Sequence, residues 1–360
     1  MNVLLITDLY PVKESEKYTP KTLYNFVKSW EELGHNVTVI KPNFLINSFI
    51  RKKPFYKEGK YGNIINLNYM TPFFDVKKAE KYCNYSDFDI IIAHMPVGIL
   101  FADRLGIDFV AGCHVSDIQV LTSPIYKFYF RHALKKAYKN AKCIACRSEQ
   151  LKNKFLKLFP DMENKVFIAS SGVNREIIVK REIKSNPTRI LTAAHLIKRK
   201  NVDKIIEAVK DFPEMTLTVT GSGEELPKLK KIAGKNVVFK GQLPHEEVLE
   251  EMRNSDIFIL PSVNETLGMV YLEALASGCI TVGVKNDGAD GIIKDGENGF
   301  LLNSPTVDEI KTVIEKIKNY PEPQKITDNA YNQMLNYTDT ACAENYLQQI
   351  LKFFDKNAKI

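Results

Sequence analysis

Short apolar runs alternate with longer segments of helical periodicity along most of this 360-residue chain. Residues 2–7, 88–94 and 217–223 are typical of the apolar runs, and each has the length of a strand that is buried on both faces. This alternation argues against an all-helical or an all-β protein and predicts an α/β fold with parallel sheets. The length favours two domains, and the polar segment 176–187, which ends in proline, is the expected linker between them.

The composition is that of an ordinary globular protein, with 44% hydrophobic and 26% charged residues. Its apolar runs all fall well short of the roughly 20 residues that span a bilayer. The six cysteines lie mostly inside apolar segments, which indicates reduced thiols and predicts a cytoplasmic location. Cys143 and Cys146 have the spacing of a redox or metal pair, but we expect them to be small buried residues in a strand.

Charge is unevenly distributed along the chain. Residues 1–180 hold 27 Lys and Arg against 17 Asp and Glu, whereas residues 181–360 hold 23 against 26. Two stretches of the basic half, 44–61 and 126–139, interleave aromatic and basic residues. The helical spacing of the second favours a helix packed on its sheet with a solvated basic face. The alternative is contact with an anionic membrane surface, which would make the protein peripheral at the inner face of a membrane.

The segment that says most about function is PSVNETLGMVYLEALASG, residues 261–278, which carries two glutamates. The apolar run 256–261 that leads into it predicts a strand, and the residues that follow have helical spacing. We therefore expect Glu265 in a strand-to-helix turn and Glu273 about two turns into the helix. In an open parallel sheet, ligands bind at the carboxyl ends of the strands, where such turns lie.

Backbone amides at the expected start of this helix would face an anion held in the turn. Thr266, Leu267 and Gly268 supply these amides, and Gly268 has no side chain to block a close approach. Glutamates near a helix start are also common for structural reasons, because negative charge suits the helix dipole. The two glutamates by themselves therefore leave a purely structural role open.

The wider pattern is more specific. PS-x2-E-x-x-G, then EA-x-A-x-G, then a strand-like run and a Gly-rich turn closely resemble the donor-sugar motif of the retaining glycosyltransferases of family 4, which have the GT-B fold. The resemblance is strong over residues 188–302 and looser over residues 1–174. It implies an α/β protein with two Rossmann-like domains that face an interdomain cleft. The implied parts are an acceptor-binding domain (1–175), a nucleotide-sugar-binding domain (188–336) and a C-terminal helix (337–360) that crosses back to the first domain.

The resemblance also implies roles for individual residues. The catalytic residues would be His114, Lys200 and Glu265. The donor-binding residues would be His195, Arg199, Gly221, Gly223, Leu243, Thr266, Leu267, Gly268 and Glu273. The acceptor-side residues would be Lys13, Lys17 and Asp117.

Two departures from the family pattern stand out. His195 lies where the family usually has an arginine on the donor diphosphate, and a neutral imidazole binds anions more weakly than a guanidinium does. Lys198 and Arg199 are the candidates to compensate for it. The loop after the first strand has lysines, Lys13 and Lys17, where the family often has glycines.

The implied activity is the retaining transfer of a hexosyl unit, an EC 2.4 reaction, from a UDP- or GDP-sugar to a hydroxyl of a glycan or lipid-linked acceptor. Such reactions build cell-surface polysaccharides and glycoconjugates. We expect neither a metal nor another cofactor, and no nucleic-acid partner. Two alternatives remain open, namely another GT-B enzyme such as a sugar-nucleotide epimerase, and a non-catalytic sugar-nucleotide-binding homologue.

Overall fold

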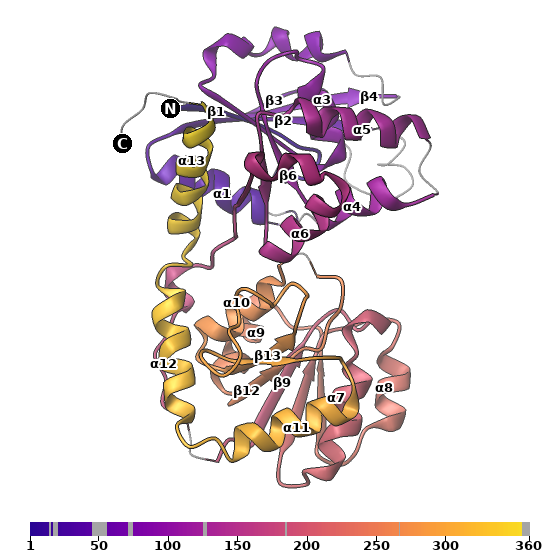
Figure 1. The fold of residues 1–360 in the computed structure, drawn as a ribbon, viewed down its shortest axis with the longest axis vertical. Helices are drawn as coiled ribbons and strands as arrows, with labels where there is room; N and C mark the ends of the chain where they lie inside the picture. The colour runs from indigo at the N-terminus through magenta and orange to yellow at the C-terminus, as the bar shows by residue number, and fades with distance from the viewer. Residues whose placement is uncertain are drawn as a thin grey trace. The chain divides into compact units, whose positions relative to one another are not determined.

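Two compact units make up the computed structural model, which describes residues 1–13, 16, 21–44, 56–70, 75–124, 128–183, 186–265 and 267–354. The first unit combines Met1–Ser170 with Asp339–Ile360, and the second is Ser171–Thr338 (Figure 1). Each unit has one largely parallel sheet covered by helices, so the predicted α/β fold class is confirmed. Lys17, Thr266 and much of the stretch 44–61 lie outside the described residues.

The first unit is built on an eight-stranded sheet of order β3-β4-β2-β1-β5-β6-β7-β8, in which β3 alone pairs antiparallel. Its strands are β1 (Asn2–Ile6), β2 (Asn36–Phe44), β3 (Gly59–Tyr61), β4 (Ile64–Tyr69), β5 (Ile90–His94), β6 (Val110–Cys113), β7 (Cys143–Cys146) and β8 (Val166–Ile168). Its helices are α1 (Thr22–Glu32), α3 (Met95–Asp103), α4 (Val115–Thr122), α5 (Phe128–Asn140), α6 (Glu149–Leu158) and α13 (Asp339–Phe354). Because the strand order reverses between β1 and β5, their carboxyl ends mark the point where doubly wound sheets bind ligands.

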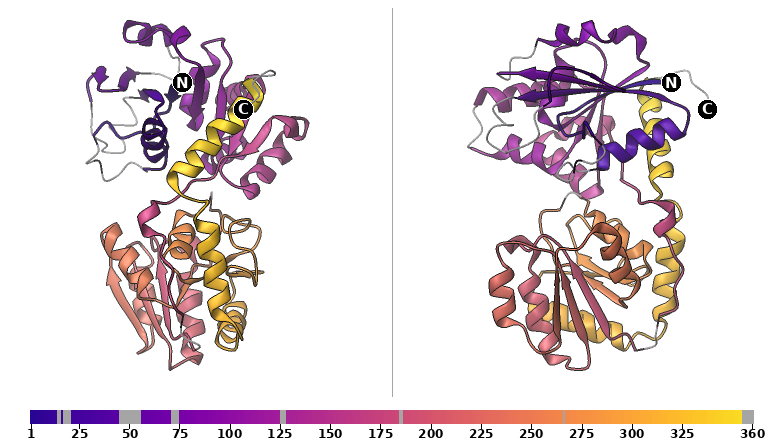
Figure 2. Two further views of the ribbon diagram at one scale, coloured as in Figure 1. Left: turned by 90° about the vertical axis from the view of Figure 1, so that its left-hand side faces the viewer. Right: turned by 180° about the vertical axis from the view of Figure 1, so that it is seen from behind.

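Helices cover both faces of this sheet. Leu4 and Ile6 of β1 belong to a core shared with Leu121, Leu134 and Phe155, which come from α4, α5 and α6. The other face is covered by α1 and α13, which pack against each other (Figures 1 and 2). Helix α13 therefore belongs to the first unit.

Helix α5 contains most of the basic aromatic stretch 126–139. Leu134 and Tyr138 are fully buried, whereas Lys135, Lys136 and Lys139 are exposed. Around Leu134 and Tyr138 the helix therefore has a packed apolar side and a solvated basic side, and these two apolar residues are held in the core. Membrane contact stays a prediction, and for this helix it is supported by the positive charge of the exposed lysines.

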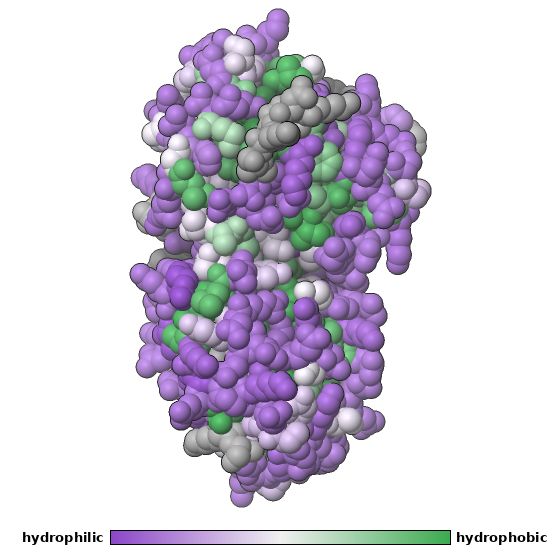
Figure 3. All heavy atoms as spheres, turned by 60° about the vertical axis from the view of Figure 1, so that its left-hand side comes forward, coloured by the Kyte–Doolittle hydropathy of each residue, from purple (hydrophilic) through white to green (hydrophobic). Residues whose placement is uncertain are grey.

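Hydrophilic residues dominate the molecular face drawn in Figure 3, where hydrophobic residues emerge in separate areas. Exposed apolar residues of this kind are usual on folded proteins. Within the described ranges, no helix combines the length and the apolar character needed to cross a membrane.

The second unit has a six-stranded parallel sheet of order β11-β10-β9-β12-β13-β14. Its strands are β9 (Arg189–Ala193), β10 (Thr216–Thr220), β11 (Val237–Gly241), β12 (Ile257–Ile259), β13 (Ile280–Val284) and β14 (Phe300–Leu302). Its helices are α7 (Val202–Ala208), α8 (Leu226–Ile232), α9 (His245–Arg253), α10 (Met269–Ala276), α11 (Val307–Lys318) and α12 (Pro323–Met334). Alternation along the strands separates two cores, with Ile190 facing the layer of α7, α8 and α11, and Leu191 facing that of α9, α10 and α12.

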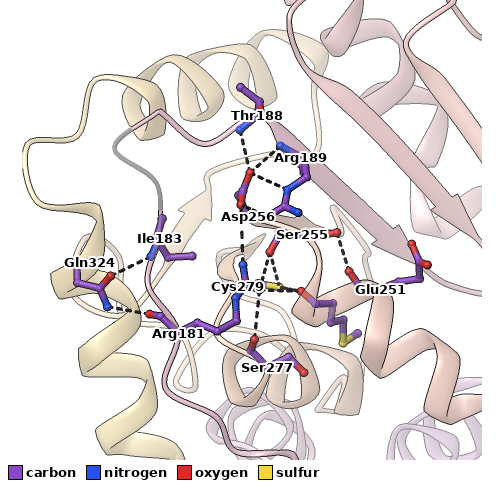
Figure 4. Close-up of polar contacts among 11 residues, drawn as sticks. Arg181, Ile183, Thr188, Arg189, Glu251, Ser255, Asp256, Ser277, Cys279 and Gln324 are labelled. Carbon is purple, nitrogen blue, oxygen red and sulfur yellow. Dashed lines mark hydrogen bonds and ion pairs between the residues drawn. The ribbon is translucent and has the colours of Figure 1, made fainter.

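The segment 176–187, in which we expected a linker, packs within the second unit instead. Its backbone is tied to that unit where Val179 N donates to Ala276 O at 2.8 Å. The Arg181 guanidinium donates through Nη1 to the carbonyl oxygens of Met252 at 3.1 Å and Ser255 at 2.8 Å (Figure 4). Arg181, one of the polar residues that suggested a solvated linker, thus binds main-chain carbonyls of the second unit.

Candidate functional site

Three donors converge on one oxygen of Glu265 at the carboxyl end of the second sheet. Arg199 Nη1 and Ser262 Oγ each lie 2.6 Å from Glu265 Oε1, and Lys200 Nζ forms an ion pair with the same atom. Lys200 and Arg199 belong to a 3-10 turn, Lys198–Lys200, between β9 and α7, and Glu265 follows β12. The structure thus brings together Arg199, Lys200 and Glu265, three of the residues that the sequence analysis assigned to the site.

This cluster keeps Glu265 ionised. Burial alone would raise the pKa of the Glu265 carboxyl, but the Lys200 charge, the hydrogen bonds from Lys200 and Ser262, and the Arg199 charge outweigh burial and lower it. The Lys200 side chain is itself buried, and Arg199 is more exposed. The site therefore holds two cations and one carboxylate in close contact, which suits an anionic, hydroxyl-bearing ligand.

The backbone that carries Glu265 is held by Asp287, a residue that the sequence did not single out. Asp287 Oδ2 accepts from Asn264 N at 2.6 Å, and Oδ1 accepts from Glu265 N and Gly288 N at 2.7 Å each. Asn264 is left-handed, with φ +62°, so the chain turns sharply just before Glu265. Asp287 follows β13, and only the pairing of β13 with β12 brings it here, which no local sequence signal reveals.

A second link joins the two loops of the cluster. Val263 N donates to Arg199 O at 3.0 Å, and Asn201 Nδ2 donates to Pro261 O at 2.8 Å. Asn201 takes the left-handed conformation, φ +51°, directly after Lys200. The loop after β9 and the loop after β12 are therefore joined by one backbone and one side-chain hydrogen bond, independently of the ion pairs.

A cavity of about 250 Å³ lies in the same unit, over the carboxyl ends of β9, β10 and β11. Its lining comprises Ala193, Ala194, His195, Thr220, Gly221, Ser222, Gln242, Leu243, Val248 and Val270. Of the residues predicted to bind the donor, His195, Gly221 and Leu243 line this cavity. Its volume is below the roughly 300–1,000 Å³ of a site that encloses a drug-sized ligand, so it has room for part of such a molecule.

Two predicted donor-binding glycines have a structural reason to be glycines. A Cβ on Gly221 would lie 1.9 Å from Ala194 O, and one on Gly223 would lie 2.3 Å from Leu196 O. Leu196 N also donates to Ser222 O at 2.9 Å, so the two loops touch along their backbones. Gly221 reaches the cavity, whereas Gly223 is absent from its lining.

The helix after Glu265 begins later than predicted. It starts at Met269, with Gly268 before it in the left-handed conformation at φ +74°. Leu267 therefore precedes the helix and has a buried side chain. Glu273 lies about one turn from the start of the helix, whereas the sequence predicted about two turns. A Cβ on Gly268 would lie 2.5 Å from the Tyr271 ring, so this close turn requires glycine.

Glu273 contacts His245, a residue that the sequence analysis did not select. Its Oε1 lies 3.0 Å from Nε2 of His245, the first residue of α9. The Glu273 side chain is largely buried, at 17% exposure, whereas that of His245 is 61% exposed. Glu273 is thus a nearly buried carboxylate with one histidine contact, close along α10 to the cavity residue Val270.

In the first unit, His114 and Asp117 are joined at the start of α4. His114 N donates to Asp117 Oδ2 at 2.7 Å, and Asp117 is fully buried. The His114 ring lies 2.9 Å, Nε2 to Nδ1, from His94, which the sequence analysis did not select. A signal was available, because His94 and His114 follow neighbouring strands and His94 pairs in register with Gly112.

The remaining acceptor-side predictions have less structural support. Lys13 is exposed, and its backbone is bound to Glu16, whose Oε1 accepts from Lys13 N at 3.2 Å. Lys17 lies outside the described residues. In the described part of the chain, no group of three or more His, Cys, Asp or Glu side chains is placed to hold a metal ion. The predicted independence of metals is not tested by this observation.

Comparison with known proteins assigns the chain to a family. The family model for glycosyltransferase family 4 matches residues 20–177, and the model for glycosyl transferases group 1 matches residues 173–333. The two matches together cover most of both units. The chain belongs to the group 1, family 4 glycosyltransferases, which have the GT-B fold.

Individual relatives are distant. An uncharacterised glycosyltransferase of Methanocaldococcus jannaschii is 26% identical over 288 residues, covering 75% of this chain and 79% of that protein. A probable sucrose-phosphate synthase of Thermosipho melanesiensis is 28% identical over 263 residues, covering 64% of this chain and 61% of its own length. The crystal structure of HepE from Anabaena, in complex with UDP, aligns with a TM-score of 0.74 at 15% identity, covering 98% of this chain and 100% of that chain. This last similarity shows the fold alone.

Proposed function

We propose that the protein transfers a sugar, with retention of configuration, from a UDP- or GDP-sugar to a hydroxyl of a glycan or lipid-linked acceptor. The observation that supports this most is the position of the Arg199, Lys200 and Glu265 cluster on the same sheet edge as the cavity lined by His195 and Leu243. A nucleotide sugar has a base, a diphosphate and a hydroxyl-rich ring. The cavity suits the first part, and the cluster suits the other two.

Charge development explains why cations are needed. When the sugar–phosphate bond breaks, negative charge grows on the leaving diphosphate, and preorganised donors that meet it lower the barrier. Lys200 and Arg199 are held ready by Glu265, at one shared oxygen. In the complex, the diphosphate would replace Glu265 as the partner of these two cations. Glu265 would then accept hydrogen bonds from donor-sugar hydroxyls. These cations supply the neutralisation that a metal ion provides elsewhere, so we propose that the reaction needs no metal.

In this proposal, Glu273 binds the ribose of the donor. A carboxylate can accept from both ribose hydroxyls, and Glu273 is a nearly buried carboxylate on the helix that also carries Val270 of the cavity wall. His245, now 3.0 Å from Glu273, would keep that carboxylate oriented. HepE of Anabaena was solved in complex with UDP, which favours a uridine nucleotide as the first donor to test.

Retention without a protein nucleophile is the remaining part of the proposal. His114 would hydrogen-bond to the reacting sugar, and the acceptor hydroxyl would attack from the face that the diphosphate leaves, giving its proton to the departing phosphate. The specific observation that favours a second candidate, a non-catalytic sugar-nucleotide-binding protein, is the exposed His195 on the cavity wall in place of arginine. We propose a cytoplasmic enzyme of polysaccharide or glycoconjugate synthesis, with the exposed lysines of α5 available to an anionic membrane surface.

A titration of UDP-, GDP- and ADP-sugars, followed by turnover assays in EDTA, tests this function. We expect one class to bind and to turn over without metal. Glu273→Ala should raise KM for the donor more than it lowers kcat, because ribose contacts are made equally in the ground and transition states. Glu247→Ala, which removes an exposed carboxylate from α9, is the matched control and should change neither. Binding without turnover would favour the non-catalytic homologue, and a collapsed kcat at normal KM would give Glu273 another role.

A further inference from the structure

A chain of hydrogen bonds runs from the last helix of the protein to His114. Tyr346, on α13, has its hydroxyl 3.0 Å from Nε2 of His94, and Nδ1 of His94 lies 2.9 Å from Nε2 of His114. His94 ends β5, and His114 directly follows β6, the neighbouring strand. All three residues belong to the first unit, in which α13 lies beside α1 (Figure 1).

Tyr346 is fixed in place by an aromatic cluster. Its ring is fully buried and lies 5.4 Å from Phe26, 5.7 Å from Trp30 and 5.9 Å from Phe167, measured between ring centroids. Trp30 Nε1 also donates to the backbone of α13 at Ala343 O, at 2.9 Å. The hydroxyl of Tyr346 is therefore presented to His94 by a rigid support, as a positioning group requires.

The fold also makes room for the His94 ring. A Cβ on Gly112, the partner of His94 in the sheet, would lie 2.0 Å from ring atoms of His94. Met95, directly after His94, takes the left-handed conformation at φ +66°, which is rare for a residue other than glycine, asparagine or aspartate. Strain of this kind persists where the surroundings enforce one arrangement, and it clusters at functional sites.

The proton positions along the chain follow from hydrogen-bond accounting. Among the described residues, the Tyr346 hydroxyl has one hydrogen-bond partner, His94 Nε2, and a buried hydroxyl that does not donate is costly. Tyr346 therefore donates to Nε2, so a neutral His94 has its proton on Nδ1 and donates to His114 Nε2. His114 then has its own proton on Nδ1.

Neither histidine needs a positive charge in this arrangement. Burial lowers the pKa of His94 well below its usual range, with contributions from His114 and the Arg147 charge. Burial and the Arg147 charge lower the pKa of His114 to about 3. The capping box at the start of α4 turns the Asp117 amide toward the His114 side chain, which by itself would favour Nδ1 as an acceptor. That amide also donates to His114 O at 3.0 Å, so the donor chain from Tyr346 decides the tautomer.

We propose that Tyr346 and His94 are positioning residues that fix the tautomer and ring orientation of His114, so that α13 takes part in catalysis through a hydrogen-bond relay. The relay presents His114 Nδ1–H as a donor to a sugar oxygen. This inference rests on the proposed contact between His114 and the reacting sugar, but the tautomer itself is a property of the free protein. The two proposals can therefore fail separately.

The test combines histidine NMR with kinetics on the full chain. In protein labelled with 15N at its six histidines, His114 should be a single Nδ1–H tautomer in the wild type and a mixture in Tyr346→Phe. We expect kcat of Tyr346→Phe to fall about 3- to 10-fold, the worth of one ordinary hydrogen bond, with KM for the donor within twofold. Tyr85→Phe, which removes a hydroxyl that donates to Val76 O at 2.7 Å elsewhere in the first unit, is the matched control. It should lower stability but change neither the tautomer nor kcat.

His94 variants provide the second line of evidence and serve if Tyr346→Phe does not fold. An asparagine at this position can still donate to His114 Nε2, so His94→Asn should keep the His114 tautomer and most of kcat. His94→Leu should lose both. A folded Tyr346→Phe or His94→Leu protein with an unchanged His114 tautomer and a kcat within twofold of wild type would overturn the relay. If no nucleotide sugar turns over at all, the proposed function fails, and the NMR result still decides the relay.

Discussion

At the scale of single residues, the ion pair of Lys200 and Glu265 shares its carboxylate with a second cation. Arg199 and Ser262 both reach Glu265 Oε1, so removing Lys200 leaves that carboxylate with two partners. The usual cost of stranding a buried charge is therefore reduced here. For this reason, activity measured on Lys200 variants can report on the reaction rather than on folding.

Sequence reasoning could find these site residues because a recognisable pattern surrounds each of them. Lys200 and Glu265 stand in motifs next to apolar strands, and strand ends in a parallel sheet meet along one edge. Asp287 and Tyr346 could not be found in this way. Each reaches the site from a distant part of the chain, and nothing beside them in the sequence marks a hydrogen bond to residue 264 or 94.

Asp117 gives a residue-scale prediction about pH. Burial raises the pKa of its carboxyl to about 8, against the lowering effect of the hydrogen bond from His114 N. The unfolded value is about 3.9. Between these values the folded state binds more protons than the unfolded state, so the free energy of unfolding falls as pH rises from about 4 to about 8.

Asp117→Asn removes this titration and keeps an oxygen for His114 N. The change in Tm on going from the wild type to Asp117→Asn should be more favourable at pH 9 than at pH 5, by at least about 2 °C. Thermal melts at the two pH values measure this difference. An equal change at both pH values, or a larger gain at pH 5, would show that Asp117 is ionised in the folded protein.

At the scale of elements, most predicted strands and helices form, but some of them begin or end at other residues than predicted because of long-range contacts. The predicted strand 256–261 is β12, Ile257–Ile259, because Asp256 instead accepts from Thr188 N and Arg189 N at its start. The strand-like run that follows the EA-x-A-x-G motif forms β13, Ile280–Val284. The late start of α10 depends on the left-handed Gly268, which hydrophobic periodicity does not report.

The segment around Arg181 gives an element-scale prediction. Arg181→Met removes the Nη1 donor to Met252 O and Ser255 O, which keep the weaker contacts from Cys279 Sγ (Figure 4). We expect a loss of about 1–3 kcal/mol in the free energy of unfolding, measured by urea titration. Lys180→Met is the matched control, because its ion pair with Asp328 is exposed and should cost about 1 kcal/mol or less. Equal losses in both variants would mean that the segment is held by its backbone alone.

At the scale of the whole molecule, each unit positions its residues by the same rule, with the functional side chains in the loops that follow parallel strands. Lys200 and Glu265 follow β9 and β12 of the second sheet, and His114 follows β6 of the first. The last helix returns to the first unit, where Tyr346 contacts His94. The family match assigns the class of reaction, whereas the donor and the acceptor depend on individual side chains that the family does not fix.

We propose that Lys200 stabilises the leaving diphosphate as the sugar bond breaks. Its contribution should then appear in kcat, since the charge that it meets is greatest in the transition state. The measurement is kcat at saturating donor for Lys200→Ala, with Lys204→Ala as the control for a partly exposed lysine on α7 and a thermal melt for each. We predict that kcat of Lys200→Ala falls by roughly 10²–10³ while Lys204→Ala matches the wild type. A folded Lys200→Ala enzyme with kcat within threefold of the wild type would contradict the claim and remove Lys200 from the site.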